Sequence, residues 1–420
     1  MNITISKKNN LISGFSIGML FLGFYVLTNY IAKEGMLPPF ANSIALYAFI
    51  GVSFVSLCFN LKTMKLPNFT IWYASIVVLS AISFMYSGHI VYSALIEMVV
   101  CLILSFCFIM TINNFVKVDV LARVYIWSSV LMAFILLVTD QLILNVEEGE
   151  RLGEELSGNA NAFSNMILVA TIFTSWFMVY CCKNKTRWLY VLAFLSQLFV
   201  MALSGGRKNM IASIICALVF IFFYSGKKKT SIIKRLLLCA VLVLSVYWAI
   251  MNIPILYDAI GHRFESLLND FFGIETTANK VGSDVIREKM VEIGLEGWLE
   301  APIFGHGLDN FKYHCQDVLN RFCYAHNNYV ELLYDIGLIG FVAYYIFIAY
   351  MFIKLIKLPS TLLKYKILGI GLLVGIAVFD FGGVSFYTAL SICALAIVYA
   401  IINISYKHLN QEEQVVNDRI

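Results

Sequence analysis

The chain contains 420 residues, of which 60% are hydrophobic and 13% are charged, whereas soluble domains average about 45–50% and about 25%. This composition, with a mean hydropathy of +0.81 and repeated apolar runs, excludes a water-soluble globule. Runs of about 20 residues suffice to cross a ~30 Å hydrocarbon core as helices, so a polytopic helical membrane protein is predicted. The net charge of +4 is too small to indicate nucleic-acid binding.

Twelve transmembrane helices are predicted along the chain. We therefore expect an all-α fold in which residues 1–420 form a single integral membrane domain. The predicted spans cover residues 11–32, 40–59, 69–86, 90–112, 120–139, 163–182, 188–204, 209–224, 232–251, 337–356, 365–379 and 384–404.

The basic residues indicate which ends of these helices face the cytoplasm. With a cytoplasmic N-terminus, about two thirds of the 30 Lys and Arg residues fall on the cytoplasmic side, as the positive-inside rule expects. An even number of spans then leaves both termini in the cytoplasm. Two outer segments are longer than simple connectors: an acidic one over 140–162, and one over 252–336 whose aromatic and apolar content predicts that it packs as an extracytoplasmic segment.

Within the longer outer segment, residues 283–301 have the pattern of an amphipathic helix that ends at Pro302. Acidic residues recur at every fourth position and should face water, because like charges at this spacing repel each other. The opposite stripe should lie on the membrane domain; it contains Ile286, Met290, Ile293 and Gly297. Arg287 falls beside that apolar stripe, where a guanidinium favours an anion and suits the geometry of a phosphate.

Two other outer positions carry side chains suited to binding or catalysis. Arg207 lies in a glycine-containing turn over 204–209, where few basic residues are expected and backbone can approach a ligand closely. Contact with a lipid headgroup is the simpler explanation for it. His326 precedes a predicted span, where an ordinary hydrogen-bonded histidine is the simpler explanation. The spacing of Gly305 and Gly307 is by itself weak evidence for phosphate binding.

Of the ten cysteines, Cys315 and Cys323 lie outside the predicted spans on the outer side. In an oxidising compartment this pair can form a disulfide. A zinc site with the neighbouring His314 and His326 is a weaker alternative, because the spacing matches no structural zinc pattern.

Several short motifs, taken in order, resemble the O-antigen ligase and polymerase superfamily of bacterial membrane glycosyltransferases. His326 and Asn327, followed by the Gly-Leu-Ile-Gly of residues 337–340, resemble its histidine signature. The 305–307 turn and the upstream Arg287 follow the order of the family. Residues 204–207 are similar to its serine–glycine–arginine turn, and Arg151 begins a weaker family pattern that continues to 161. The resemblance runs from about residue 151 to 340, and the first five spans carry no such motif.

The resemblance implies a GT-C-like fold and a metal-independent enzyme, without cofactor, that transfers a glycan from undecaprenyl pyrophosphate to an acceptor sugar. It implies catalytic roles for His326 and Arg287, and substrate-binding roles for Arg207, Arg151 and Asn327. Cations at a span mouth suit a departing pyrophosphate, and a histidine can take the acceptor proton or donate to phosphate. The expected location is the bacterial inner membrane, with the active site on the extracytoplasmic face and a flippase and chain-length regulator as partners.

Two acceptors fit this chemistry. A polymerase extends another lipid-linked repeat unit of O-antigen or capsule, and residues 325–333 with the basic pair at 207–208 favour it. An O-antigen ligase transfers the glycan to lipid A core, and the histidine signature fits that reaction too. A lipid-linked oligosaccharide flippase is a third alternative, but the related halves and polar mid-membrane helices typical of transporters are missing. Among the acidic residues, Glu97 lies inside a predicted span and Asp380 directly follows another, so a proton or ion relay through the membrane has little support.

Overall fold

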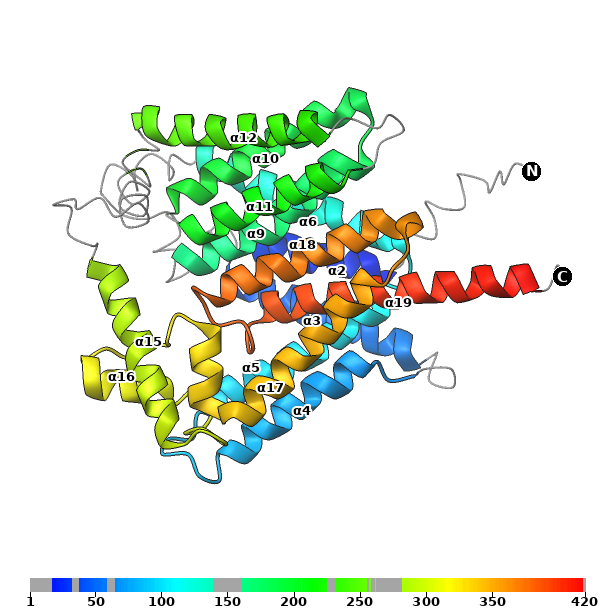
Figure 1. Ribbon diagram of the computed structural model, residues 1–420. Helices are drawn as coiled ribbons and strands as arrows, with labels where there is room; N and C mark the ends of the chain where they lie inside the picture. Colours follow the sequence, from blue (N-terminus) through cyan, green and yellow to red (C-terminus); the bar gives the residue numbers. More distant parts are fainter. Residues whose placement is uncertain are drawn as a thin grey trace.

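A computed structural model of the chain describes residues 17–31, 38–58, 65–138, 160–204, 206–224, 232–254, 257, 261 and 282–417. Within these ranges the protein is built from helices and contains no strand (Figure 1). The expectation of an all-α fold is confirmed for this part of the chain.

Each of the twelve predicted spans coincides with a helix. The helices before the acidic segment are α2 (Ile17–Ile31), α3 (Pro39–Cys58), α4 (Asn68–Ser83), α5 (Tyr92–Thr111) and α6 (Phe115–Val138). Those after it are α9 (Ala160–Trp176, continued by the π-helical turn Phe177–Cys181), α10 (Arg187–Leu203), α11 (Arg207–Phe223), α12 (Ile232–Asn252), α15 (Gly282–Glu300), α16 (Phe311–Leu319), α17 (Asn328–Ile356), α18 (Leu363–Asp380) and α19 (Ala389–Asn417).

The apolar character of these helices supports an integral membrane protein. By length and composition, 6 of the described helices can cross a membrane, and other apolar helices of 10–17 residues accompany them. Some boundaries differ from those predicted: α6 begins at Phe115 rather than at 120, and α19 begins at Ala389 rather than at 384 and continues to Asn417. The residues added at 115–119 and at 405–417 include charged side chains, which hydropathy alone places outside a span.

The centre of the bundle is formed by α9 and α19. In the most apolar part of each helix, 83% of the residues of α9 and 78% of those of α19 are buried inside the protein, compared with 50% of those of α5. Helix α19 packs along α5 and α18, while α9 packs against α6, α10, α11 and α18. The peripheral helices expose large apolar side chains such as Leu20, Phe54 and Trp248. An apolar interior beneath an apolar surface is typical of a protein surrounded by lipid.

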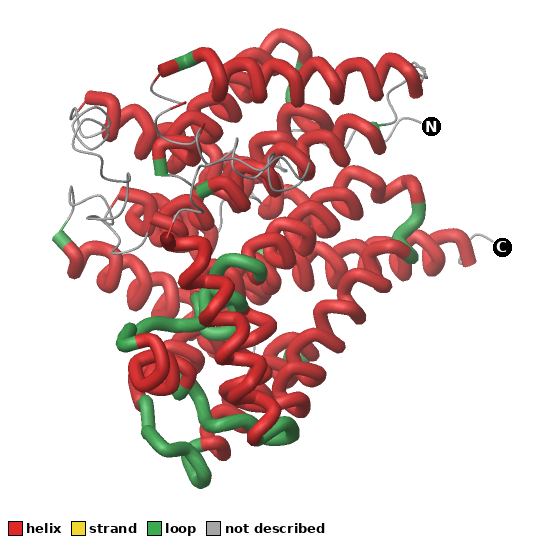
Figure 2. Tube along the Cα trace, turned by 60° about the vertical axis from the view of Figure 1, so that its left-hand side comes forward, coloured by secondary structure: helices red, strands yellow, loops and turns green. Residues whose placement is uncertain are grey.

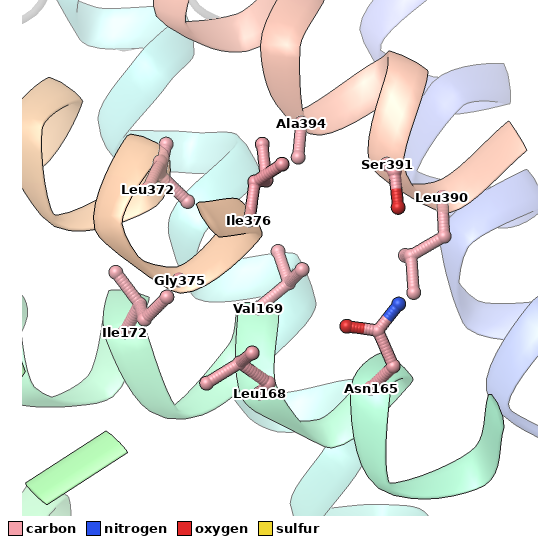
Figure 3. Close-up of a pocket in the computed structure, with 10 residues that line it drawn as sticks. All are labelled: Asn165, Leu168, Val169, Ile172, Leu372, Gly375, Ile376, Leu390, Ser391 and Ala394. Carbon is pink, nitrogen blue, oxygen red and sulfur yellow. The ribbon is translucent and has the colours of Figure 1, made fainter. Parts of the chain in front are cut away.

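A small cavity interrupts the core where α9, α18 and α19 meet (Figure 3). Most of its lining is aliphatic, and the Asn165 amide and the Ser391 hydroxyl are the polar side chains at its wall. Its volume of about 10 Å³ corresponds to a single water at most. This cavity therefore has no room for a substrate.

The two ends of the bundle differ. At one end the short connections carry basic residues; there Lys364 pairs with Asp119 at 3.0 Å, and Tyr365 stacks on Phe115 with ring centroids 3.9 Å apart. At the other end lie α15, α16 and the first part of α17, together with most of the longer described loops (Figures 1 and 2). The polar groups that could support chemistry gather at this second end.

Helix α15 confirms the predicted amphipathic helix over 283–301, and it packs on its neighbours rather than floating. With α16 and the first part of α17 it encloses a small core made of Met290, Ile293, Phe311, Cys315, Ala325, Val330 and Tyr334. The glutamates of its opposite face are exposed at positions 288, 292, 296 and 300.

The expected position of the apolar stripe of α15 is corrected by this packing. A Cβ on Gly297 would lie 2.6 Å from the Tyr334 ring, and one on Gly294 would lie 2.3 Å from Val330. The stripe therefore lies against the first part of α17 and α16, not on the main bundle. The sequence pattern shows that a face is buried, but it does not say which element covers it.

Candidate active site

Helix α17 is broken at Gly337, where the tenth span was predicted to begin. Gly337 has φ 65° and ψ −169°, so residues 328–336 and 338–356 are separate helical segments. A break of this kind leaves backbone groups without helical partners. The turn after α15 supplies new ones. The amide at 306 donates to the carbonyl at 334 and the amide at 307 to the carbonyl at 335, both at 2.8 Å, and the amide at 338 donates to the carbonyl at 302 at 2.9 Å.

Glycine is required on both sides of this contact. Gly305 has φ +73°, and a Cβ there would lie 2.6 Å from the backbone of Asp335. A Cβ on Gly337 would lie 2.3 Å from the carbonyl oxygen of Ile303. The turn that contains Gly305 and Gly307 is therefore structural, and the amides at 306 and 307 bind protein backbone rather than a phosphate.

Side-chain hydrogen bonds and ring stacking also stabilise the turn after α15. The buried carboxylate of Asp335 accepts hydrogen bonds from the consecutive amides of residues 309–311, at 2.8, 3.2 and 3.3 Å. These are amides at the start of α16, which have no partner within that helix. The ring of His306 stacks on Tyr334 with centroids 4.5 Å apart, and its Nε2 lies 2.7 Å from the carbonyl oxygen of Gly297. The broken helix, the turn and α15 thus form one packed unit.

Two asparagines attach this unit to the bundle. The side chain of Asn310 donates to the Ser87 hydroxyl at 2.7 Å and accepts from the His89 amide at 3.0 Å, both in the α4–α5 loop. The Asn328 side chain accepts from the amides of residues 385 and 386 at 2.7 and 3.1 Å, in the α18–α19 connection. Elements far apart in the sequence therefore fix the start of α17.

His326 lies in the loop that joins α16 to α17. Its backbone is left-handed, with φ 52°, and its ring packs on Tyr324 with centroids 4.2 Å apart. Its Nδ1 is buried and has no hydrogen-bond partner among the described residues. Burial first, and then the charges of Arg287 and Lys208, lower the pKa of His326 to about 4. The ring is therefore neutral at pH 7 and can accept a proton.

Two cations from different helices affect the protonation of this ring. Arg287 lies in the second turn of α15 and is half-buried, and Lys208 lies in the first turn of α11. The charge of each acts on His326. Lys208 also donates to the carbonyl of Phe381 at the end of α18, at 2.6 Å. Cations held by separate helices beside a neutral imidazole provide a place for an anion.

The other three predicted site residues differ in how much the structure describes of each. Arg207 is the first residue of α11, next to Lys208, and its backbone is described. Arg151 lies outside the described residues. Asn327 is the N-cap of α17: its Oδ1 accepts from the amides of Tyr329 and Val330 at 3.0 and 3.2 Å. The oxygen of Asn327 thus orients α17 directly after His326.

Sequence reasoning did not single out Glu331 and Asp335, or assign Lys208 to the site. Glu331 is fully buried, and its Oε2 accepts a hydrogen bond from the Ala325 amide at 2.6 Å. Its other carboxylate oxygen has no partner among the described residues. The available signal is a pair of acids four residues apart in an otherwise apolar run, which places both on one face of a buried helix.

The nearby cysteines and histidines do not form a metal site. In the described ranges no three His, Cys, Asp or Glu side chains are arranged to hold a metal ion. The Sγ atoms of Cys315 and Cys323 instead lie 3.6 Å from each other, while His314 lies beside the Tyr334 ring, 5.3 Å between centroids. The zinc alternative therefore has no support in this geometry.

Comparison with known proteins places these residues in a family. No curated protein matches the chain. A family model described as O-antigen ligase matches residues 191–345. That stretch includes Lys208, Arg287 and His326, as well as the turn after α15 and the helix break at Gly337. The chain therefore contains an O-antigen ligase family domain, as the resemblance of its motifs predicted.

Proposed function

We propose that the protein is a glycosyltransferase that moves a glycan from a polyprenyl pyrophosphate to an acceptor sugar. The family to which its domain belongs consists of glycan-transferring enzymes and implies a lipid-linked glycan substrate. The observation that carries the proposal is the buried Nδ1 of His326, which has no partner among the described residues and whose protonation is affected by the charges of Arg287 and Lys208. These groups lie at one end of a bundle of apolar helices, where a lipid-borne substrate would present its charged group.

The cations suit the leaving group of this reaction. Pyrophosphate gains negative charge as the bond between its oxygen and the anomeric carbon breaks, so cations already in place lower the barrier. Arg287 and Lys208 are held by α15 and α11, and Arg207 directly precedes Lys208 in the sequence. A guanidinium binds phosphate oxygens in pairs, whereas the ammonium group acts as a point charge.

His326 suits the acceptor side of the reaction. The acceptor hydroxyl attacks the anomeric carbon, and its proton passes to the neutral imidazole as the new glycosidic bond forms. A bound pyrophosphate offsets the charges of Arg287 and Lys208, two of the causes that lower the pKa of His326. Donor binding therefore raises the pKa of His326 and makes it a stronger base while the substrate is present.

We infer that this end of the bundle faces the extracytoplasmic side of a bacterial inner membrane. The short basic connections, including Lys364 and Lys366, gather at the opposite end, as expected for cytoplasmic loops. The proposed acceptor is a second lipid-linked repeat unit, which makes the protein an O-antigen or capsule polymerase. A ligase that uses lipid A core as acceptor would employ the same three groups.

Substitution at the site tests the proposed chemistry. We expect His326→Ala and Arg287→Ala each to abolish long-chain polysaccharide while the protein still inserts into the membrane. His314→Ala and Lys289→Ala are matched controls on the same outer segment, and they should preserve chain length. Wild-type chain length in both His326→Ala and Arg287→Ala would disprove the assignment of the site.

Deletion of the protein, followed by analysis of its glycans, separates the candidate reactions. Single repeats attached to lipid A core indicate lost polymerisation. Long undecaprenyl-linked chains beside bare core indicate lost ligation instead. Lipid-linked repeats that no longer reach the outer face would identify a flippase and contradict the transferase.

A further inference from the structure

The loop that presents His326 contains one member of a cysteine pair. Cys315 lies in α16 and is fully buried in the small core formed with α15 and α17. Cys323 lies in the loop, three residues before His326. The two Sγ atoms are 3.6 Å apart, and both side chains are free thiols. A disulfide bond holds its two sulfur atoms about 2.05 Å apart, and here the two sulfur atoms already lie beside each other.

We propose that Cys315 and Cys323 form a disulfide that ties the His326 loop to α16. The proposal depends on the proposed function in one respect, the extracytoplasmic placement of this end, because disulfides persist in oxidising compartments. The contact between the two sulfur atoms is the observation that carries it. Both side chains also pack in the same small core, where Cys315 is buried and Cys323 is partly buried.

The disulfide would restrict a stretch that has little regular structure. Helix α16 ends at Asn320 in a left-handed conformation, with φ 54°, and residues 321–325 form no helix. At the end of this stretch, the loop is fixed by the hydrogen bond from the Ala325 amide to Glu331. A covalent bond at Cys323 removes conformational freedom from the segment in between and thus from the approach to His326.

The order of the two steps follows from exposure. Cys323 is half-exposed, whereas Cys315 is buried, and burial raises the pKa of the Cys315 thiol to about 12. Cys323 is the more accessible sulfur, so its thiolate attacks the disulfide of a thiol oxidase first and releases one oxidase sulfur as a thiolate. Cys315 then loses its proton and attacks Sγ of Cys323, which releases the oxidase as a dithiol. Two electrons pass to the oxidase, and two protons are lost from the pair.

Thiol labelling of the full-length protein tests the bond directly. Cells are quenched in acid, and the denatured protein is alkylated before and after reduction, digested and analysed by mass spectrometry. We expect Cys315 and Cys323 to be labelled only after reduction, and the unreduced digest to contain their two peptides joined. Cys58, exposed at the end of α3, is the internal control and should be labelled in both samples. Labelling of both Cys315 and Cys323 without reduction would overturn the proposal.

Variants test the role of the bond in the site. Cys323→Ser, Cys315→Ala and the double variant should lower long-chain polysaccharide several-fold and to the same level, because each removes the same bond. A reducing agent should lower the unfolding temperature of the wild type in detergent by a few degrees and leave the double variant unchanged. An equal effect of the reductant on both proteins would count against the bond. The labelling result does not depend on glycan transfer, so it can fail or succeed independently of the proposed function.

Discussion

At the scale of single residues, the protonation of His326 depends on its neighbours and should change when the site is occupied. In the free protein burial and two nearby cations lower its pKa to about 4. The value of kcat/KM reports the free enzyme, and kcat reports the substrate complex. We expect kcat/KM to be retained from neutral pH down to about pH 4, where the base becomes protonated. The acid limb of kcat should lie at higher pH, because the pyrophosphate offsets both cations.

Transfer from a purified lipid-linked donor, measured with the protein in liposomes between pH 4 and pH 8, checks this behaviour. Lys208→Gln removes one of the charges that lower the pKa of His326, so it should move the acid limb of kcat/KM to higher pH. Coincident acid limbs for kcat and kcat/KM would show that the donor leaves the protonation of His326 unchanged. If the acid limb of kcat/KM does not move in Lys208→Gln, the charge of Lys208 has no effect on the pKa of His326.

Glu331 should act as a positioning residue, because its Oε2 accepts the hydrogen bond of the Ala325 amide at 2.6 Å. Glu331→Gln keeps an acceptor oxygen at this position and should preserve most of the transfer rate. Glu331→Ala leaves a buried amide without its partner, which costs about 1–3 kcal/mol. If the transition state is destabilised by this amount, the rate of glycan transfer drops about 5- to 150-fold.

Retention of the transfer rate in Glu331→Gln would distinguish a positioning role of Glu331 from a role in proton transfer. Transfer rates of the two variants are compared with that of Glu296→Ala, which changes an exposed acid of α15 and should behave as wild type. A Gln variant as inactive as the Ala variant would mean that the carboxyl proton matters, and not the acceptor oxygen.

The sequence indicates only part of this site. Arg287 and His326 could be proposed from the sequence because each belongs to a local motif. The helical pattern of residues 283–301 also places Arg287 beside the apolar stripe. Lys208 could not be assigned, because its position relative to His326 depends on how α11 and the loop between α16 and α17 are arranged in space. Glu331 and Asp335 lie in an apolar run, and their partners are backbone amides of residues up to 26 positions away. No local pattern encodes such contacts.

At the scale of elements, the interlocked glycines of α17 and the preceding turn should be intolerant of substitution. The backbone of Gly337, at φ 65° and ψ −169°, lies in a region that is essentially restricted to glycine and costs other residues about 1–3 kcal/mol. A Cβ there would also lie 2.3 Å from the Ile303 carbonyl. We expect Gly337→Ala to lower the unfolding temperature in detergent and to reduce transfer. Gly305→Ala should have a similar effect.

Gly51→Ala in α3 is the matched control, because a Cβ at this position has nothing within 4 Å. Alanine is the better helix former, so this variant should be neutral or slightly stabilising. The role assigned to the broken helix would be wrong if Gly337→Ala unfolded at the same temperature as Gly51→Ala.

Hydropathy identifies the helices of the bundle but not the shape of α17. All the predicted spans coincide with helices, since long apolar runs leave a helix as the only way to satisfy the backbone in lipid. The nine residues at the start of α17 were outside the predicted span because they include Asn328, Glu331 and Asp335. Their helix is stabilised by contacts with α15 and with the α18–α19 connection, which are tertiary and therefore absent from a local pattern.

At the scale of the whole molecule, the proposed reaction requires the two ends of the bundle to face different compartments. One end carries the Lys364–Asp119 pair and the indole of Trp176, which donates to the carbonyl of Lys364 at 2.7 Å. The other carries α15, α16 and the His326 loop. The placement of charge at the first end predicts that it is cytoplasmic.

Accessibility of single cysteines tests this sidedness. In a background from which the native cysteines have been removed, Glu296→Cys introduces a thiol on the exposed face of α15, and Lys185→Cys introduces one in the exposed turn after α9. A membrane-impermeant maleimide should label position 296 in intact spheroplasts and position 185 only after detergent is added. The two variants control for each other, because each differs only in the end of the bundle that it reports. Labelling in the opposite order would place His326 in the cytoplasm, away from an extracytoplasmic lipid-linked donor.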